Sequence, residues 1–322
     1  MKKWMVPLVF MVFLTVAIGI TAKFLKRDEK PKIVVVLQEL NTDLSKTIKA
    51  GIEKGFADFD IDGKVIAPDS QDSESKQIAM LKDVLKQKPD ALIIIPIQSA
   101  ASIPVFKEYQ KRNIPVLMLY QDARWKDQTT FIGTDHLRLG KIAGELLSSF
   151  LQPGDQVVII HDTKTNATVN DRIMGAKETL ENGGIEIVTE QMGDDESRNA
   201  KVVISNILQT YPNIRGVFAT NDNIALEALK VIEEKELKIP VVGPDGTSGM
   251  LKAIEEGKLN VTLASNPYDM GYLSVEQALK AIKGEHVDKR IDSGVDIVTK
   301  DNAKSRIDFY TKNVFYKREI FK

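Results

Sequence analysis

Short apolar runs alternate along the chain with longer segments in which apolar residues recur every three or four positions. The short runs are typical of strands that are buried on both faces of a sheet, and they span residues 33–37, 64–67, 91–95, 116–120, 131–134, 157–160, 186–189, 217–219, 241–242 and 261–264. The longer segments have the period of amphipathic helices, and they span residues 44–59, 75–87, 101–112, 136–151, 169–182, 198–210, 224–235, 247–256 and 270–283.

The regular alternation of strand and helix predicts parallel sheets whose crossover helices cover both faces. This many strands are more than one twisted sheet holds comfortably. We therefore predict an α/β chain with two doubly wound parallel-sheet domains, which share a pattern and not a sequence.

Polar residues stand at the ends of two of these strands in the second half of the chain. Asn221 and Asp222 follow the apolar run 217–219, and Asp245 follows the run 241–242. In open α/β sheets ligands bind just beyond the carboxyl ends of parallel strands, so these side chains are expected to face one crevice. The alternative is that Asp222 and Asp245 only cap the helices that follow, since Asp is a favoured N-cap residue.

The same two strand ends carry a family resemblance. The segments Thr220-Asn221-Asp222 and Gly243-Pro244-Asp245-Gly246-Thr247 resemble the strand ends of substrate-binding proteins of the ribose-binding type, relatives of the lactose-repressor effector domain. The resemblance extends from about residue 32 to the strand that ends near residue 298. It implies that Asn221 and Asp245 hydrogen-bond the hydroxyl groups of a sugar.

The resemblance also implies a type I periplasmic binding protein fold, in which two α/β domains are joined by a hinge that the chain crosses three times. The first domain would comprise residues 31–134 plus 266–293, and the second would comprise residues 135–265 plus 294–322. The segments 133–135 and 265–267 are expected hinges, because short polar and proline-containing segments can absorb a domain rotation.

Further ligand contacts follow residue by residue from the resemblance. In the second domain, Arg172 matches a family Arg that presents a fork of donors, and Ser265 stands where the family often has Gln. In the first domain the pattern is altered. Tyr120 and Gln121 replace an Asp-Arg pair, and the segment with the family's Asn and stacking aromatic residues reads Asn41, Thr42, Asp43, Leu44 and Ser45.

These substitutions predict a retained fold with a changed ligand. Loss of the Asp-Arg pair removes two charges and a rigid guanidinium fork, and loss of the aromatic pair removes stacking area. We therefore expect ribose to bind poorly and another sugar, or a sugar-like molecule, to be the ligand. Asp122 and Arg124 are expected to be loop charges, and Trp125 is a possible replacement aromatic face.

Composition excludes several other classes. The 322-residue chain has 44 basic and 45 acidic residues and a net charge of −1, which gives no reason to expect a nucleic-acid partner. It has no cysteine, and its histidines, His136, His161 and His286, lack metal-ligand spacing. Nucleophile-elbow and phosphate-loop motifs are absent from the sequence. We expect neither catalysis nor a cofactor or metal.

The N-terminus predicts a membrane location. Lys2 and Lys3 precede an uncharged stretch from Trp4 to Ala22, close to the roughly 20 residues that span a bilayer. The lysines would stay inside and the rest of the chain would lie outside. Because Ile20 makes a poor cleavage site, we expect residues 1–30 to be an uncleaved anchor and stalk, with a cleaved signal peptide as the alternative.

Three functional classes compete. The first is an anchored sensor that closes around a sugar and signals to a membrane histidine kinase, which the uncleaved anchor favours. The second, kept as the alternative, is the substrate-binding component of a sugar ABC importer, with a permease as partner. A transcription regulator is close to excluded, because residues 1–30 leave no room for a DNA-binding helix-turn-helix.

Overall fold

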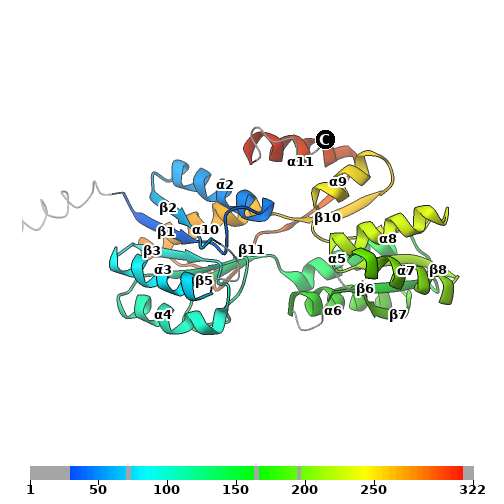
Figure 1. Cartoon of the computed structure of the whole chain (residues 1–322), viewed down its shortest axis with the longest axis horizontal. Coiled ribbons are helices and arrows are strands. Elements are labelled where there is room, and N and C mark those ends of the chain that lie inside the picture. The colour runs from blue at the N-terminus through cyan, green and yellow to red at the C-terminus, as the bar shows by residue number, and fades with distance from the viewer. Residues whose placement is uncertain (1–29, 70–73, 163–166, 194–196, 315–322) are drawn as a thin grey trace, which may run out of the picture.

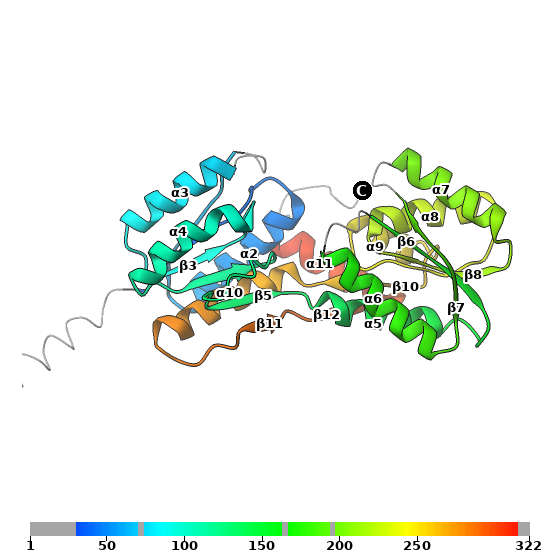
Figure 2. The same cartoon turned by 90° about the horizontal axis from the view of Figure 1, so that it is seen from below.

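The computed structural model describes residues 30–69, 74–162, 167–193 and 197–314, which form two α/β lobes lying side by side along the long axis of the molecule (Figure 1). The view from below shows the parallel strands of each lobe with helices packed around them (Figure 2). The predicted α/β architecture with parallel sheets is confirmed.

The first lobe is built on a six-stranded parallel sheet with the order β11-β5-β4-β3-β1-β2. Its strands are β1 (Lys32–Val36), β2 (Asp62–Ile66), β3 (Ala91–Ile94), β4 (Val116–Leu119), β5 (Thr130–Gly133) and β11 (Arg290–Asp292). One face is covered by α2 (Asp43–Asp58) and α10 (Pro267–Ile282), and the other by α3 (Glu74–Lys86) and α4 (Ser99–Lys111). Because the central strands are apolar throughout, each face has its own buried core.

The second lobe is built on a four-stranded parallel sheet with the order β7-β6-β8-β9. Its strands are β6 (Gln156–His161), β7 (Glu186–Met192), β8 (Ile214–Ala219) and β9 (Val241–Val242). One face is covered by α5 (His136–Ser148) and α6 (Ala167–Asn182), and the other by α7 (Ser197–Thr210), α8 (Asp222–Glu234) and α9 (Ser248–Glu255).

Two features of the second lobe differ from the sequence-based prediction. Strand β10 (Val261–Ser265) pairs antiparallel with β12 (Val295–Thr299), and it lies beside β9 through a 3.0 Å hydrogen bond from Leu263 N–H to the Gly243 carbonyl. A further helix, α11 (Lys300–Asn313), follows β12. The apolar pattern did not predict α11 because its buried residues are only Ala303 and Ile307.

The chain passes between the lobes three times. It crosses from β5 to α5 through residues 134–135, from β10 to α10 through Asn266, and from β11 to β12 through residues 293–294. The backbone N–H of Asp135 donates to Asp292 Oδ1 at 3.2 Å, so the first and third crossings are tied to each other. Segments that cross between lobes are where a rotation of one lobe against the other would be absorbed.

Helix α11 lies over the junction between the lobes (Figures 1 and 2). It packs on α9 of the second lobe. Its Arg306 donates to the Ser265 carbonyl at 2.8 Å and pairs with Asp296 at 2.5 Å, so it contacts β10 and β12 beside two crossings. Its Phe309 ring lies edge-on to Tyr268 of α10, with ring centroids 5.1 Å apart. A helix of the second lobe thus also contacts the first.

Glycines allow one close helix pair in each lobe. In the first lobe a Cβ atom at Gly51 of α2 would lie 1.9 Å from the carbonyl oxygen of Tyr268 of α10. In the second lobe a Cβ atom at Gly140 of α5 would lie 2.2 Å from the carbonyl oxygen of Arg172 of α6. Any larger residue would push these helices apart, so the α5–α6 contact fixes the backbone of Arg172.

The predicted membrane anchor lies outside the described residues. Within the part of the chain that the structure covers, no helix combines the length and apolar character needed to cross a membrane. The ammonium group of Lys30 pairs with Asp60 at 2.5 Å where the chain enters the first lobe.

Candidate ligand-binding cleft

A cavity of about 1090 Å³ opens between the two lobes, beside the crossing segments. Side chains of the loop 120–128, which follows β4, and of residues 289–292 around β11 line one side. The first crossing, residues 133–136, and the start of α6, residues 167–172, line the other. The carboxyl ends of β4 and β5 meet this cavity, which is where open α/β sheets bind ligands.

Arg172 is the best-anchored cation in the cavity wall. Its side chain is mostly buried, and each of its nitrogen atoms has a partner. Nη1 donates to the Thr220 carbonyl at 2.6 Å, Nη2 pairs with Asp245 Oδ1 at 2.9 Å, and Nε donates to His136 Nδ1 at 3.4 Å. The guanidinium plane is therefore held in one orientation, as recognition of a ligand by a fork of donors requires.

Asp245 and Asp222 join two strand ends of the second lobe. The Asp222 carboxylate accepts from the backbone N–H groups of Asp245 at 3.0 Å and Thr247 at 2.7 Å. The backbone N–H of Asp222 in turn donates to Asp245 Oδ2 at 3.2 Å. Burial and the adjacent charge of Asp245 raise the pKa of Asp222 to about 7.

His136 begins α5 and lines the cavity next to Arg172. Burial and the positive charge of Arg172 lower the pKa of His136 to about 4, so the imidazole is neutral at neutral pH. Because Nδ1 accepts from Arg172, the remaining ring proton is on Nε2, which makes that atom a donor. Sequence reasoning missed His136 because it searched the histidines only for metal-ligand spacing.

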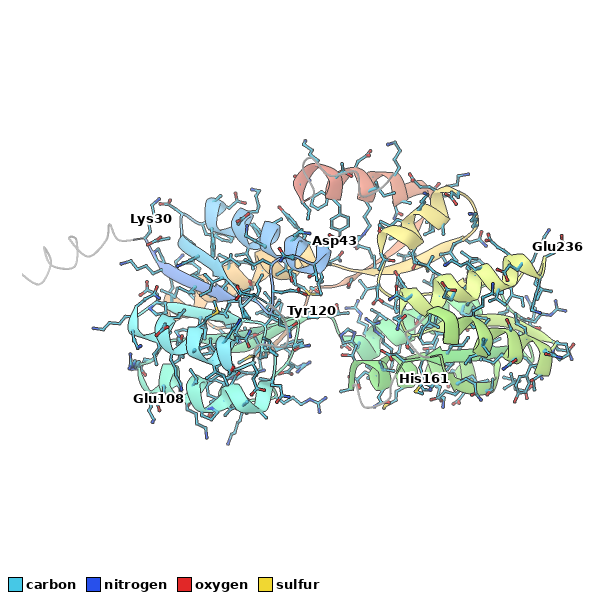
Figure 3. All side chains as sticks on the ribbon, in the orientation of Figure 1. Lys30, Asp43, Glu108, Tyr120, His161 and Glu236 are labelled. Carbon is cyan, nitrogen blue, oxygen red and sulfur yellow. The ribbon has the colours of Figure 1, made fainter. Side chains whose placement is uncertain are left out.

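Tyr120 follows β4 in the wall of the first lobe. The N–H of Gln121 donates to the Leu119 carbonyl at 2.6 Å and closes a γ-turn in which Tyr120 has a φ of 61°. A positive φ is costly for a tyrosine, and such strain is typical of functional sites. Tyr120 lies at the edge of the first lobe that faces the second (Figure 3). Burial and the charge of Asp245 raise its pKa, so its hydroxyl is protonated.

The remaining predicted residues of the first lobe have local partners or are exposed. Gln121 accepts a hydrogen bond from Gln38 Nε2 at 2.9 Å. Thr42 is the N-cap of α2, and its Oγ1 accepts from the N–H of Ser45 at 3.2 Å. Asn41 and Leu44 are exposed beside this cap. The start of α2 is therefore an ordinary helix terminus in this conformation.

Asn221 and Ser265 also have structural partners. Asn221 is the N-cap of α8, and its Oδ1 accepts from the N–H of Ile224 at 2.9 Å. Asn221 is therefore a helix cap, and contact of its amide group with a ligand stays a prediction. The alternative that Asp222 and Asp245 are the caps is wrong, because the N-caps of α8 and α9 are Asn221 and Thr247. Ser265 ends β10, where its carbonyl accepts from Arg306.

The structure brings only part of the predicted set to the cavity. Tyr120, Gln121 and Arg172 line it, and Asp245 is joined to it through Arg172, whereas Asn41, Thr42, Leu44, Ser45, Asn221 and Ser265 lie outside its lining.

The loop after β4 is held by its own contacts. Asp122 accepts from Arg290 and from Gln128 Nε2, and it also lines the cavity, so its role as a loop charge without ligand contact stays a prediction. Trp125 packs on Phe106, with ring centroids 5.7 Å apart, so little of its ring is available to a ligand.

The described part of the chain contains no group of three His, Asp or Glu side chains arranged to hold a metal ion. The cavity wall instead collects hydrogen-bonding groups: a guanidinium, a neutral imidazole, a phenol and a carboxylate. These groups can bind a polyhydroxylated molecule through several directional hydrogen bonds.

A sequence profile described as the periplasmic binding protein domain matches residues 33–286. The chain belongs to this family. It is 30% identical over 260 residues to the ribose import binding protein of Bacillus subtilis, covering 81% of this chain and 84% of that protein. It is 28% identical over 298 residues to the D-ribose/D-allose-binding protein of Pseudomonas aeruginosa, covering 87% and 92%. These relatives are binding proteins, which confirms that the chain is not an enzyme.

Solved structures agree with the fold. A periplasmic ribose ABC transporter protein from Conexibacter woesei superimposes with a TM-score of 0.79 at 22% identity, covering 87% of this chain and 95% of that one. A periplasmic solute-binding protein of an ABC transporter from Actinobacillus succinogenes, with bound D-allose, gives a TM-score of 0.72 at 27% identity, covering 86% and 100%. The family match ends at residue 286, so α11 lies beyond it.

Proposed function

We propose that this protein is the extracytoplasmic substrate-binding component of a sugar ABC importer. The observation that supports this most is the network of Arg172, Asp245 and Asp222, which places a prearranged set of hydrogen-bonding groups at an interlobe cavity of a periplasmic binding protein fold. The relatives named above bind ribose or allose, and the related Actinobacillus protein holds D-allose.

The mechanism we propose is a two-lobe clamp. The lobes, residues 31–134 plus 266–293 and residues 135–265 plus 294–322, rotate about the three crossings. The second lobe would hold the sugar first, through Arg172, Asn221 and Asp245. Tyr120, Gln121 and the start of α2 would then close on it from the first lobe. Ligand contacts from both lobes favour the closed form, which a permease recognises.

The sensor function expected from the sequence has no support among the relatives, whose names describe binding and import. The importer function, kept as the alternative, is therefore the one we propose. Retention of residues 1–30 as a membrane anchor remains part of the proposal. The anchor would keep the binding lobes on the extracytoplasmic side of the membrane, close to the permease. N-terminal sequencing of the extracted protein checks this, and a mature chain that begins near Lys23 would contradict it.

The ligand we propose is a sugar other than ribose, because Tyr120 and Gln121 replace the Asp-Arg pair of the ribose-binding type. Isothermal titration of the full-length chain with D-ribose, D-allose, D-galactose, D-arabinose and myo-inositol tests the proposal. At least one should bind more tightly than D-ribose. Binding of none of them, by a chain whose circular dichroism shows it folded, would overturn the sugar assignment. Ribose binding with a micromolar dissociation constant (about −8 kcal/mol) would show that the altered first-lobe wall does not redirect specificity.

A further inference from the structure

Asp222 is a deeply buried acid beside the cavity, but its side chain does not line the cavity. Its side chain is 1% exposed, and it stands directly after Asn221, the N-cap of α8. Since Asn221 caps the helix, the Asp222 carboxylate is not needed for that purpose. A buried carboxylate is costly unless it is fully hydrogen-bonded, so its partners indicate why it is there.

Both partners of the Asp222 carboxylate belong to the loop between β9 and α9. Oδ1 accepts from the N–H of Asp245 at 3.0 Å, and Oδ2 accepts from the N–H of Thr247 at 2.7 Å. The N–H of Asp222 returns a bond to Asp245 Oδ2 at 3.2 Å, which leaves Asp245 Oδ1 for Arg172 at 2.9 Å. Each oxygen of Asp245 is therefore positioned by one fixed donor.

The surroundings leave no room for another arrangement. A Cβ atom at Gly243 would lie 2.7 Å from Asp222 Oδ1 and 2.9 Å from the Cβ of Ala225. Gly246 has a φ of 68°, a conformation that favours glycine, and it turns the loop back so that Thr247 N–H reaches Asp222. The loop sequence Gly243 to Thr247 is thus built around the Asp222 carboxylate.

We propose that Asp222 is the positioning residue of the cleft: it makes no contact with the ligand, and it fixes Asp245, and through Asp245 the Arg172 fork, in the orientation that a sugar requires. This inference rests on the proposed function. A preorganised site binds more tightly because the ligand does not have to order the side chains that contact it.

The protonation state of Asp222 follows from the same geometry. The charged groups that face it are Asp245 and, across Asp245, Arg172. A protonated carboxyl group can no longer accept from both N–H groups with two anionic oxygens, so protonation weakens one of the two loop contacts. Because the pKa of Asp222 is raised to about 7, sugar affinity should fall as the pH is lowered through this value.

Thr247 offers a matched pair of variants that leaves Asp222 in place. Its φ of −65° is the value that proline requires, and it is the N-cap of α9 without a side-chain cap bond. Thr247→Pro deletes the N–H donor to Asp222, whereas Thr247→Val keeps that donor and removes the hydroxyl, which also hydrogen-bonds the Asp222 carboxyl group. The Asp222→Asn variant replaces one acceptor oxygen by a donor group, and Asp301→Asn makes the same change in the exposed first turn of α11.

The experiment measures D-allose and D-ribose affinity of the full-length chain by titration calorimetry between pH 6 and 8, with circular dichroism as the folding control. Thr247→Pro and Asp222→Asn should bind at least about tenfold more weakly than the wild type at pH 8. Asp222→Asn should also lose the pH dependence. Asp301→Asn should stay within about threefold of the wild type. Thr247→Val loses the hydroxyl contact to Asp222 but keeps the N–H donor, so it should lose less affinity than Thr247→Pro. Wild-type affinity and pH profile in both Thr247→Pro and Asp222→Asn would overturn the inference.

Hydrogen exchange of the peptide 243–248 separates this inference from the proposed function. The Asp245 amide should exchange slowly in the wild type and in Thr247→Val, and faster in Asp222→Asn. If neither sugar binds the wild type, the choice of ligand fails and the exchange result decides the inference. Faster exchange in Asp222→Asn than in Asp301→Asn would then support positioning by Asp222, and equal exchange would overturn it.

Discussion

The two walls of the cleft are built on different principles. In the second lobe, Arg172, Asp222 and Asp245 hold one another through hydrogen bonds and an ion pair of 2.7 to 3.2 Å that include their backbone groups. In the first-lobe wall, Gln121 is exposed and accepts from Gln38, and Asp122 accepts from Gln128 and Arg290, so the contacts are separate side-chain pairs. If the proposed clamp is right, we expect the second lobe to select the chemical groups of the ligand in advance and the first lobe to adapt when it closes.

The largest expected effect is the loss of the Asp245 charge. Asp245→Asn keeps an acceptor for the Asp222 N–H but removes the ion pair with Arg172, so sugar affinity should fall by about 100-fold, roughly 3 kcal/mol. Titration calorimetry of the full-length variant measures this. Asn221→Ser serves as a second variant, because serine still caps α8 but lacks the amide group. An unchanged affinity in both would mean that the residues only cap and connect helices.

The two close helix pairs sharpen the comparison further. Gly51→Ala and Gly140→Ala each place a methyl group within van der Waals overlap of a facing carbonyl oxygen, at 1.9 and 2.2 Å. Both should lower the free energy of unfolding by about 1–3 kcal/mol, measured by denaturant titration. Only Gly140→Ala should also weaken sugar binding, because it displaces Arg172. Equal binding defects in the two variants would show that helix spacing acts on the whole molecule.

The second-lobe wall should also govern the pH dependence of stability. The pKa of His136 is lowered from the ordinary 6.5 to about 4. Between these two pH values the unfolded state binds a proton that the native state does not bind, so the free energy of unfolding rises with pH. The pKa of Asp222 is raised from the ordinary 3.8 to about 7. Between these two pH values the native state binds a proton that the unfolded state does not bind, so the free energy of unfolding falls with pH. Each group contributes a slope in the free energy of unfolding of up to about 1.4 kcal/mol per pH unit. The two contributions have opposite signs between about pH 4 and 6.5.

Single variants should reveal each slope. Relative to the wild type, His136→Gln should lose stability as the pH rises from 4 to 6.5, and Asp222→Asn should gain it. Urea titrations at half-unit pH steps measure both. Parallel profiles for the wild type and the two variants would show that neither group titrates differently in the folded chain.

The smallest effects are expected in the first-lobe wall. Tyr120→Phe removes one hydroxyl that faces the Arg172–Asp245 pair, and sugar affinity should fall by about tenfold, roughly 1 kcal/mol. Leu44→Ala, at an exposed helix start outside the cavity lining, should change it by less than threefold. Calorimetry on both variants compares them directly. A Leu44→Ala effect as large as that of Asp245→Asn would reverse the assignment of the two walls.

The sequence predicted those parts of the fold that depend on burial. Strands such as β3 and β8 are apolar runs between parallel neighbours, as expected. The sequence did not predict helix α11, because this helix buries little apolar area and is held in place by contacts of Arg306 with distant segments. The antiparallel pairing of β10 with β12 depends on residues far apart in the chain, which local periodicity does not encode.

The candidate site shows the same limit. The strand-end position predicted Asp245, because position after a buried strand is a local property. Arg172 lies inside α6 and was predicted only from the family resemblance. His136 and the bridging role of Asp222 depend on three-dimensional contacts, namely an imidazole against a guanidinium and a carboxylate between two loops. The one signal in the sequence is that the acidic Asp222 follows directly after Asn221, which alone is enough to cap the helix.

The three crossings also dictate the order in which the chain can fold. The sheet of the first lobe needs β11, and α2 needs α10, so Asp58 meets its Tyr272 partner 214 positions later. The second lobe in turn needs β12 and α11, which follow β11. Neither lobe can therefore be completed until nearly the whole chain has been synthesised. Such long sequence separations slow folding and leave incomplete sheets exposed. We therefore expect the chain to refold slowly from denaturant, because the contacts that complete both lobes join its two ends.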